Sequence, residues 1–354
     1  MLNKIVIFVL FLSSKCLAQS IDSETNKNIF LIGENHFIKE KYDEIKAFTF
    51  DQLKQLKKGE KASFYFELPY TLNFAFHKIK EQGDTTVFYE WFHHLYQSKN
   101  EPPSYFWIDY RDMILALIEY ADKKEIELEL MGIDTELEFR RTAFILSQFD
   151  SKVGTTIDSL LNLDFISNDR LTRNILNNHI DKLLEIPHEE IELAILRTLK
   201  KSLMIDCTIC VDRDLFMLSN FMKSYDSTVP LHFISLGLDH IVSKHDFSNA
   251  SSLFTTKYKM DTISYQSFYE LMDKDFKEKT WRVGILALNH KLKYANISKP
   301  VDLKTLMDEM ERIYIEEQLL DNDIYRANLS KNKALINLSK QLDYIIIYKT
   351  SHYK

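Results

Sequence analysis

Short apolar runs alternate with longer segments of helical periodicity along this chain, and this alternation constrains the fold more than any other feature. The predicted strands cover residues 28–32, 62–66, 127–133, 229–236, 253–260, 282–288 and 344–348. Between the first three of these strands, the predicted helices cover residues 42–57, 71–82, 85–97 and 105–124. Strands separated by helices favour a mainly parallel central sheet flanked by helices.

One long stretch interrupts this alternation. Between residues 136 and about 225 no strand pattern appears, and apolar residues recur every three or four positions from 188 to 221. This pattern indicates packed helices. We therefore predict a single α/β domain over residues 19–354. A long all-helical insertion at about 142–206 is expected to cover the C-terminal edge of the strands.

Glycine ends three of the predicted strands, and ionisable residues follow at once. The glycines are Gly33, Gly132 and Gly237, and the ionisable residues at or after the strand ends are Glu34, His36, Glu67, Asp134, Asp239 and His240. The C-terminal ends of parallel strands share one edge of a sheet, where ligands bind in such folds. We expect these side chains to meet in one crevice.

Two kinds of chemistry suit such a group. A histidine beside carboxylates can act as a general base, with a carboxylate fixing its orientation. Imidazole and carboxylate also bind zinc or manganese, so His36, Glu67 and His240 are candidate metal ligands. Trp107 is predicted to line the substrate pocket, together with Asp134 and Asp239.

The N-terminus has the pattern of a secretory signal peptide. Lys4 precedes an apolar run over residues 5–12, and Cys16-Leu17-Ala18 offers small residues for cleavage before Gln19. This pattern predicts a signal peptide at residues 1–18 and export to the periplasm or the extracellular space. Lys15 argues against a lipoprotein, and no later stretch is long and apolar enough to span a membrane.

Other classes of function find little support in the sequence. A net charge of −7 leaves no basic footprint for nucleic acid. P-loop, G-x-G-x-x-G and G-x-S-x-G motifs are absent, which argues against nucleotide cofactors and a serine nucleophile. Cys207 and Cys210 lie in a helical pattern and are interpreted as core thiols, with their oxidation state left open. The expected partner is a small-molecule or peptide substrate.

Several motifs, taken in order, resemble the erythromycin esterase superfamily, which includes the haem-binding ChaN lipoproteins and the TraB and Tiki proteins. The motifs are Gly33-Glu34-Asn35-His36, Phe66-Glu67, Gly132-Ile133-Asp134, Arg213-Asp214 with Met217 and Asn220, Gly237-Leu238-Asp239-His240, and Leu342-Asp343. The fourth is similar to the R-D-x-x-M-x-x-N helix of the esterase branch. The fifth is similar to the closing G-x-x-H of the TraB and Tiki branch.

The resemblance implies a role for each of five residues. His36 would be the base that activates water, and Glu34 and Glu67 would orient His36. Arg213 and His240 would position the substrate or transition state. The branches differ in cofactor: the esterases are thought to need none, the Tiki-like peptidases use a metal, and ChaN binds haem. Hydrolysis of an ester or amide is the expected function. A haem- or metal-binding uptake protein and an inactive exported binding protein are the alternatives.

Overall fold

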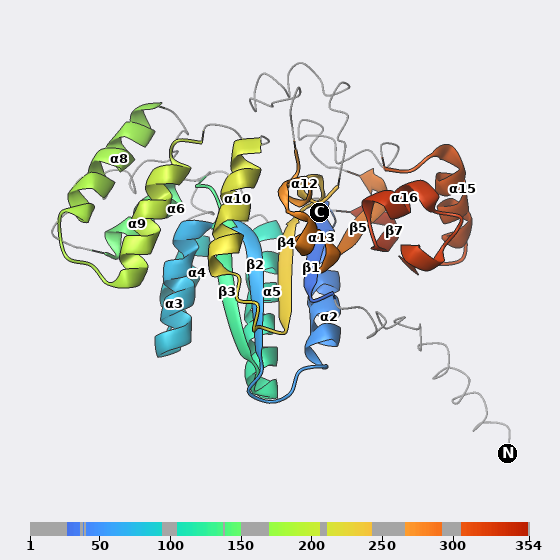
Figure 1. The fold of residues 1–354 in the computed structure, drawn as a ribbon, viewed down its shortest axis with the longest axis horizontal. Helices are drawn as coiled ribbons and strands as arrows, with labels where there is room; N and C mark the ends of the chain where they lie inside the picture. Colours follow the sequence, from blue (N-terminus) through green and yellow to red (C-terminus); the bar gives the residue numbers. More distant parts are fainter. Residues whose placement is uncertain are drawn as a thin grey trace.

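The fold is built on a seven-stranded sheet. The structure, a computed structural model, describes residues 27–35, 38, 40–93, 105–136, 139–149, 170–205, 211–242, 266–291 and 306–352. The strands are β1 (Ile29–Glu34), β2 (Lys61–Pro69), β3 (Glu127–Asp134), β4 (Leu231–Gly237), β5 (Thr280–Lys291), β6 (Ile324–Asn328) and β7 (Tyr344–His352). Their spatial order is β3-β2-β4-β1-β5-β7-β6 (Figure 1). Only β6 runs antiparallel to its neighbour, so the predicted mainly parallel sheet is confirmed.

Six of the predicted strands correspond to observed ones, and the sequence interpretation missed β6. This strand (IYRAN) lies at the edge of the sheet and is only partly buried. Because it lacks a continuous apolar run, its sequence carries no clear strand signal. The predicted strand at residues 253–260 lies outside the described residues.

Both faces of the sheet are buried under helices, and β1 shows why its sequence is apolar throughout. Phe30 and Ile32 enter one core cluster, while Ile29 and Leu31 enter the other, as the twofold alternation of a strand requires. The first face is covered by α2 (Lys41–Leu53), α3 (Asn73–Gln82), α4 (Thr86–His93) and α5 (Tyr105–Lys124). The second is covered by α10 (Val211–Ser224), α12 (Phe268–Leu271), α15 (Glu309–Gln318) and α16 (Ile336–Gln341). The short α13 (Lys274–Glu278) precedes β5.

A helical block with its own apolar core lies between β3 and α10 in the sequence. It consists of α6 (Phe139–Ser147), α8 (Arg170–Leu184) and α9 (Glu190–Ser202). Its helix α9 packs on α3 and on the 3₁₀ helix η1 (Tyr70–Leu72), which follows the C-terminal end of β2. Figure 1 shows the block on the β3 side of the sheet. As predicted, the described residues between 136 and 225 contain no strand.

A buried carboxylate anchors this block to the sheet. Glu136 follows β3 and accepts hydrogen bonds from the Thr71 backbone N–H (3.1 Å) and the Thr142 hydroxyl (2.7 Å). Its own N–H donates to the Ser202 hydroxyl oxygen at 2.7 Å. Burial raises the pKa of Glu136 to about 7, against the opposing effect of these hydrogen bonds. One residue thus joins the sheet edge to α6, η1 and α9.

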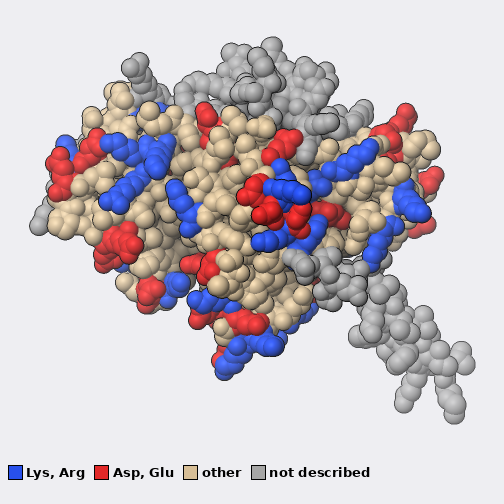
Figure 2. All heavy atoms as spheres, in the orientation of Figure 1, with Lys and Arg blue, Asp and Glu red and all other residues tan. Residues whose placement is uncertain are grey.

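The predicted signal peptide at residues 1–18 lies outside the described residues, as do Cys207 and Cys210. In the part of the chain that the structure describes, no helix combines the length and apolar character needed to cross a bilayer. On the face shown in Figure 2, acidic and basic side chains lie interspersed.

His232 on β4 is a fully buried core histidine. Its ring lies 4.5 Å from that of Tyr225, and its Nε2 is 3.2 Å from the Asp226 carbonyl oxygen. Burial lowers its pKa from 6.5 to about 4. Between these pH values the unfolded chain binds a proton that the folded chain does not. His232 therefore lowers the free energy of unfolding as the pH falls from 6.5 to 4, by about 3 kcal/mol in total.

We expect the substitution His232→Phe to remove this acid-dependent loss. Urea unfolding of both proteins at several pH values between 7 and 4 measures it. The difference in unfolding free energy between variant and wild type should change by about 3 kcal/mol over that range, in favour of the variant at low pH. If the unfolding free energies of the variant and the wild type changed with pH in the same way, His232 would not be a buried neutral histidine.

Candidate active site

Four neighbouring strands bring ionisable residues to the same edge of the sheet. Glu34 is the last residue of β1, Asp134 is the last residue of β3, and Glu67 lies near the end of β2. The 3₁₀ helix η2 (Leu238–His240) follows directly on β4. Because the strands lie in the order β3-β2-β4-β1, the structure brings these residues together at the C-terminal edge.

Arg213, in the first turn of α10, forms the strongest polar contacts of this edge. Its Nε and Nη2 donate to the two carboxylate oxygens of Asp134 at 2.8 and 2.5 Å. Nη2 also donates to Glu67 Oε1 at 2.7 Å. Such a bidentate pair fixes both distance and orientation. Arg213 is only 5% exposed, so the guanidinium is a buried, permanent positive charge between two strand ends.

His240 lies between two carboxylates. Its Nδ1 is 2.5 Å from Asp214 Oδ1, and its Nε2 is 3.4 Å from Glu67 Oε1. Burial alone would lower the pKa of His240, but the negative charges of Asp214 and Glu67 outweigh burial and raise it well above its ordinary value. This environment favours the protonated ring, which can stabilise negative charge or donate a proton.

Glu67 is the residue on which the other contacts converge. Its Oε1 faces both Arg213 and His240, and its Oε2 accepts a 2.5 Å hydrogen bond from the Gly237 N–H. A carboxylate held by three donors has little capacity left to accept a proton from water. Glu67 is therefore suited to hold Arg213 and His240 in place.

The sequence of α10 explains how one helix serves this site. Arg213 and Asp214 are adjacent and point to different partners, Asp134 and His240. One and two turns further on, Met217 is buried in the core under the sheet, and Asn220 donates to the Ile133 carbonyl oxygen at 3.0 Å. The motif R-D-x-x-M-x-x-N thus combines two site residues with two residues that attach the helix to β3.

Sequence reasoning missed Lys41 as a site residue. Its Nζ lies 2.9 Å from Glu34 Oε2, and its side chain is 0% exposed. Burial lowers the pKa of Lys41 to about 8, opposed by the Glu34 carboxylate. A lysine at the first position of a helix carries no signal of its own, because most lysines there are solvated.

An aromatic stack lies near the carboxylates of Glu67 and Glu34. The Tyr110 ring stacks on Tyr42 (centroids 4.9 Å apart) and on Trp107 (6.1 Å). Burial, together with the charges of Glu67 and Glu34, raises the pKa of Tyr110 well above its ordinary value. Tyr110 is therefore a neutral hydroxyl beside the acidic groups. Trp107, predicted to line the pocket, stacks on it from α5.

Asp239 and His36 are the remaining predicted site residues. Asp239 lies on η2 next to His240 and is partly buried. His36, the predicted base, lies outside the described residues, two positions after Glu34 in the sequence. Its role and the roles of the other predicted site residues stay predictions.

His36, one of the three candidate metal ligands, lies outside the described residues. Among them, no group of three or more His, Cys, Asp or Glu side chains is arranged to hold a metal ion. In the described structure the two ring nitrogens of His240 face carboxylates, those of Asp214 and Glu67. The oxygens of Glu67 are engaged by Arg213, His240 and Gly237.

Comparisons with known proteins give structural likeness alone. No protein-family model matches the sequence, and a search of curated proteins finds no match. A variant of the erythromycin esterase EreC in its open conformation superposes with a TM-score of 0.55 at 12% identity, covering 93% of this chain and 92% of that one. A Bacillus cereus protein gives a TM-score of 0.53 at 12% identity, covering 92% of this chain and 89% of that one. A succinoglycan biosynthesis protein gives 0.54 at 11% identity, covering 92% and 88%. The chain therefore has the fold of an erythromycin esterase over nearly its whole length.

Proposed function

We propose that this protein hydrolyses an ester bond of a small-molecule substrate at the C-terminal edge of its sheet. The observation that carries the proposal is the buried convergence of Arg213 and His240 on Glu67. Two fixed positive charges at a strand edge are what an acyl-transfer site needs to stabilise the oxyanion that forms when water adds to an acyl carbon. The likeness to an esterase fold adds support.

In this proposal each residue has a separate task. His36 takes a proton from the attacking water, and Glu34 keeps His36 and Lys41 in place. Arg213 and the His240 imidazolium stabilise the negative charge on the carbonyl oxygen, and His240 can then protonate the departing alkoxide. Glu67, Asp134 and Asp214 hold these two cations, so their contribution is positioning. Trp107 and Tyr110 offer an apolar wall for the substrate.

A panel of p-nitrophenyl esters and lactones, assayed with and without a chelator, tests the proposal. We expect kcat/KM to fall by about 100-fold or more in His36→Ala and in His240→Gln, the size of effect seen when one charge-stabilising donor is lost. His77→Gln, on α3, serves as the matched histidine control and should retain wild-type activity. Circular dichroism and thermal unfolding establish that each variant folds.

Two results would contradict the proposal. The first is wild-type activity in folded His36→Ala and His240→Gln proteins. The second is a wild-type protein that cleaves no ester but shows a Soret shift with haem, or that contains a stoichiometric metal. That result would favour the binding alternatives.

A further inference from the structure

An open polar cavity lies at the edge of the sheet opposite to the candidate active site, where the strands begin. Its volume is about 400 Å³, which is within the usual range for small-molecule sites. It is lined by Lys27, Asn28, Tyr225, Ser227, Pro230, Leu231 and Lys279. Asn28 precedes β1, Leu231 begins β4, and Lys279 precedes β5, so this cavity shares no residue with the candidate active site.

Three polar groups of the cavity, on Asn28, Tyr225 and Lys279, bear on what it could bind. The Asn28 Oδ1 atom is buried without a hydrogen bond. Among the described residues, neither the Tyr225 hydroxyl nor the Lys279 ammonium has a hydrogen bond or an ion pair. Buried polar atoms normally have a partner, so the unsatisfied Asn28 Oδ1 points to an external donor. Lys279 is exposed and Tyr225 is partly buried, so both can reach a ligand in this pocket from the solvent side.

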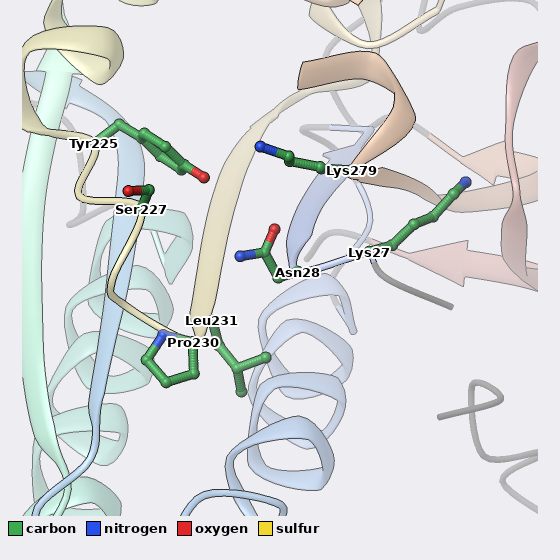
Figure 3. Close-up of a pocket in the computed structure, with 7 residues that line it drawn as sticks. All are labelled: Lys27, Asn28, Tyr225, Ser227, Pro230, Leu231 and Lys279. Carbon is green, nitrogen blue, oxygen red and sulfur yellow. The ribbon is translucent and has the colours of Figure 1, made fainter. Parts of the chain in front are cut away.

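The close-up view shows how these three groups lie (Figure 3). The hydroxyl of Tyr225, the carboxamide of Asn28 and the ammonium of Lys279 point toward one another from three different segments. Lys27 points away, in agreement with its 3.4 Å ion pair with Asp343. Lys279 is therefore the cation that serves the cavity.

The walls of the cavity are held in place by the fold. The N–H groups of Asn28 and Ile29 both donate to the Lys279 carbonyl oxygen at 3.1 Å, which ties two of the segments together. The Tyr225 ring packs edge-on against Phe276, with centroids 4.8 Å apart. The backbone at Asn28 and Lys279 and the Tyr225 ring are thus held in place before a ligand binds, which lowers the entropy lost on binding.

We propose that this cavity binds a small organic anion that also carries a hydroxyl or amine. The acidic group, carboxylate or phosphate, pairs with the Lys279 ammonium and accepts a hydrogen bond from the Tyr225 hydroxyl. The hydroxyl or amine donates to Asn28 Oδ1, and the apolar part of the ligand lies on Pro230 and Leu231. The proposal is independent of the ester hydrolysis proposed for the other edge.

Saturation-transfer NMR and calorimetry on the full chain test this site with three probes. Lactate and glycerol 3-phosphate carry the two kinds of acidic group, and glycerol is the uncharged control. We expect at least one of the two anions to bind with a Kd in the range of about 1 mM or tighter, and glycerol to bind more weakly. Whichever anion binds identifies the acidic group.

Three substitutions connect the binding to the cavity. Lys279→Met removes the cation, Asn28→Asp replaces the acceptor amide by an isosteric anion, and Lys274→Met is the matched control on the exposed side of α13. We expect the first two to weaken anion binding at least about tenfold and the control to leave it unchanged. Circular dichroism verifies folding. Equal binding by all four proteins, or no preference of the wild type for either anion over glycerol, would overturn the proposal.

Discussion

Arg213→Met is expected to lower the free energy of unfolding by about 3 to 5 kcal/mol and to abolish hydrolysis. The guanidinium pairs with Asp134 and Glu67 in a region where all three side chains are at most 10% exposed. Its loss leaves Asp134 buried without its cation and leaves Glu67 with His240 alone, and an uncompensated buried charge costs several kcal/mol. Methionine has a similar length, so a cavity is not the cause. Urea unfolding at neutral pH measures the effect.

A surface arginine provides the control for this prediction. Arg312 pairs with Glu316 at 3.1 Å on α15, where both side chains are more than a third exposed. Arg312→Met should change the unfolding free energy by less than about 1 kcal/mol, because exposed ion pairs contribute little. If Arg213→Met proved as mild as Arg312→Met, the buried ion-pair network described above would be wrong.

Gly132→Ala is expected to destabilise the protein by about 3 kcal/mol and to reduce activity at the same time. A methyl group on Gly132 would lie 2.5 Å from the Pro69 carbonyl oxygen and 2.8 Å from that of Leu68. Both atoms belong to the backbone of β2, which cannot rotate away as a side chain can. The end of β2 must shift, and Glu67 shifts with it. Urea unfolding and the ester assay measure the two effects.

Gly83→Ala separates this steric effect from a general effect of replacing glycine. Gly83 ends α3 with a φ of +66° and has open space around it. Alanine there should destabilise the protein by about 1 kcal/mol through backbone strain alone and should leave kcat/KM unchanged. Wild-type stability and activity in Gly132→Ala would show that the two strand ends approach less closely than described.

The sequence predicts the sheet well because its evidence is local. Each inner strand is a short apolar run, and the alternation with helices determines that the strands are parallel. The sequence-based prediction fails at β6, which is short, half-exposed and at the edge of the sheet. Pairing with β7, rather than a pattern in its own residues, makes this segment a strand. The same holds for Lys41: only the three-dimensional packing buries this lysine beside Glu34.

The predicted role of the strand-end glycines shows a second limit. Glycine at the end of a strand suggests a sharp turn or a close approach to a ligand. Positive φ angles occur instead at Gly59 and Gly83 among the described glycines. At Gly33 and Gly132 another part of the same chain fills the place of the missing side chain: Ile241 at the first and the end of β2 at the second. The sequence can mark such a position, but it cannot say which neighbour approaches.

The adjacency of Arg213 and Asp214 on α10 couples two contacts of the candidate site to the register of one helix. A helix behaves as a rigid rod, and a slip by one residue rotates every side chain by about 100°. Such a slip would withdraw the cation from Asp134 and the anion from His240 in a single movement. The register of α10 on β3 therefore determines both contacts together.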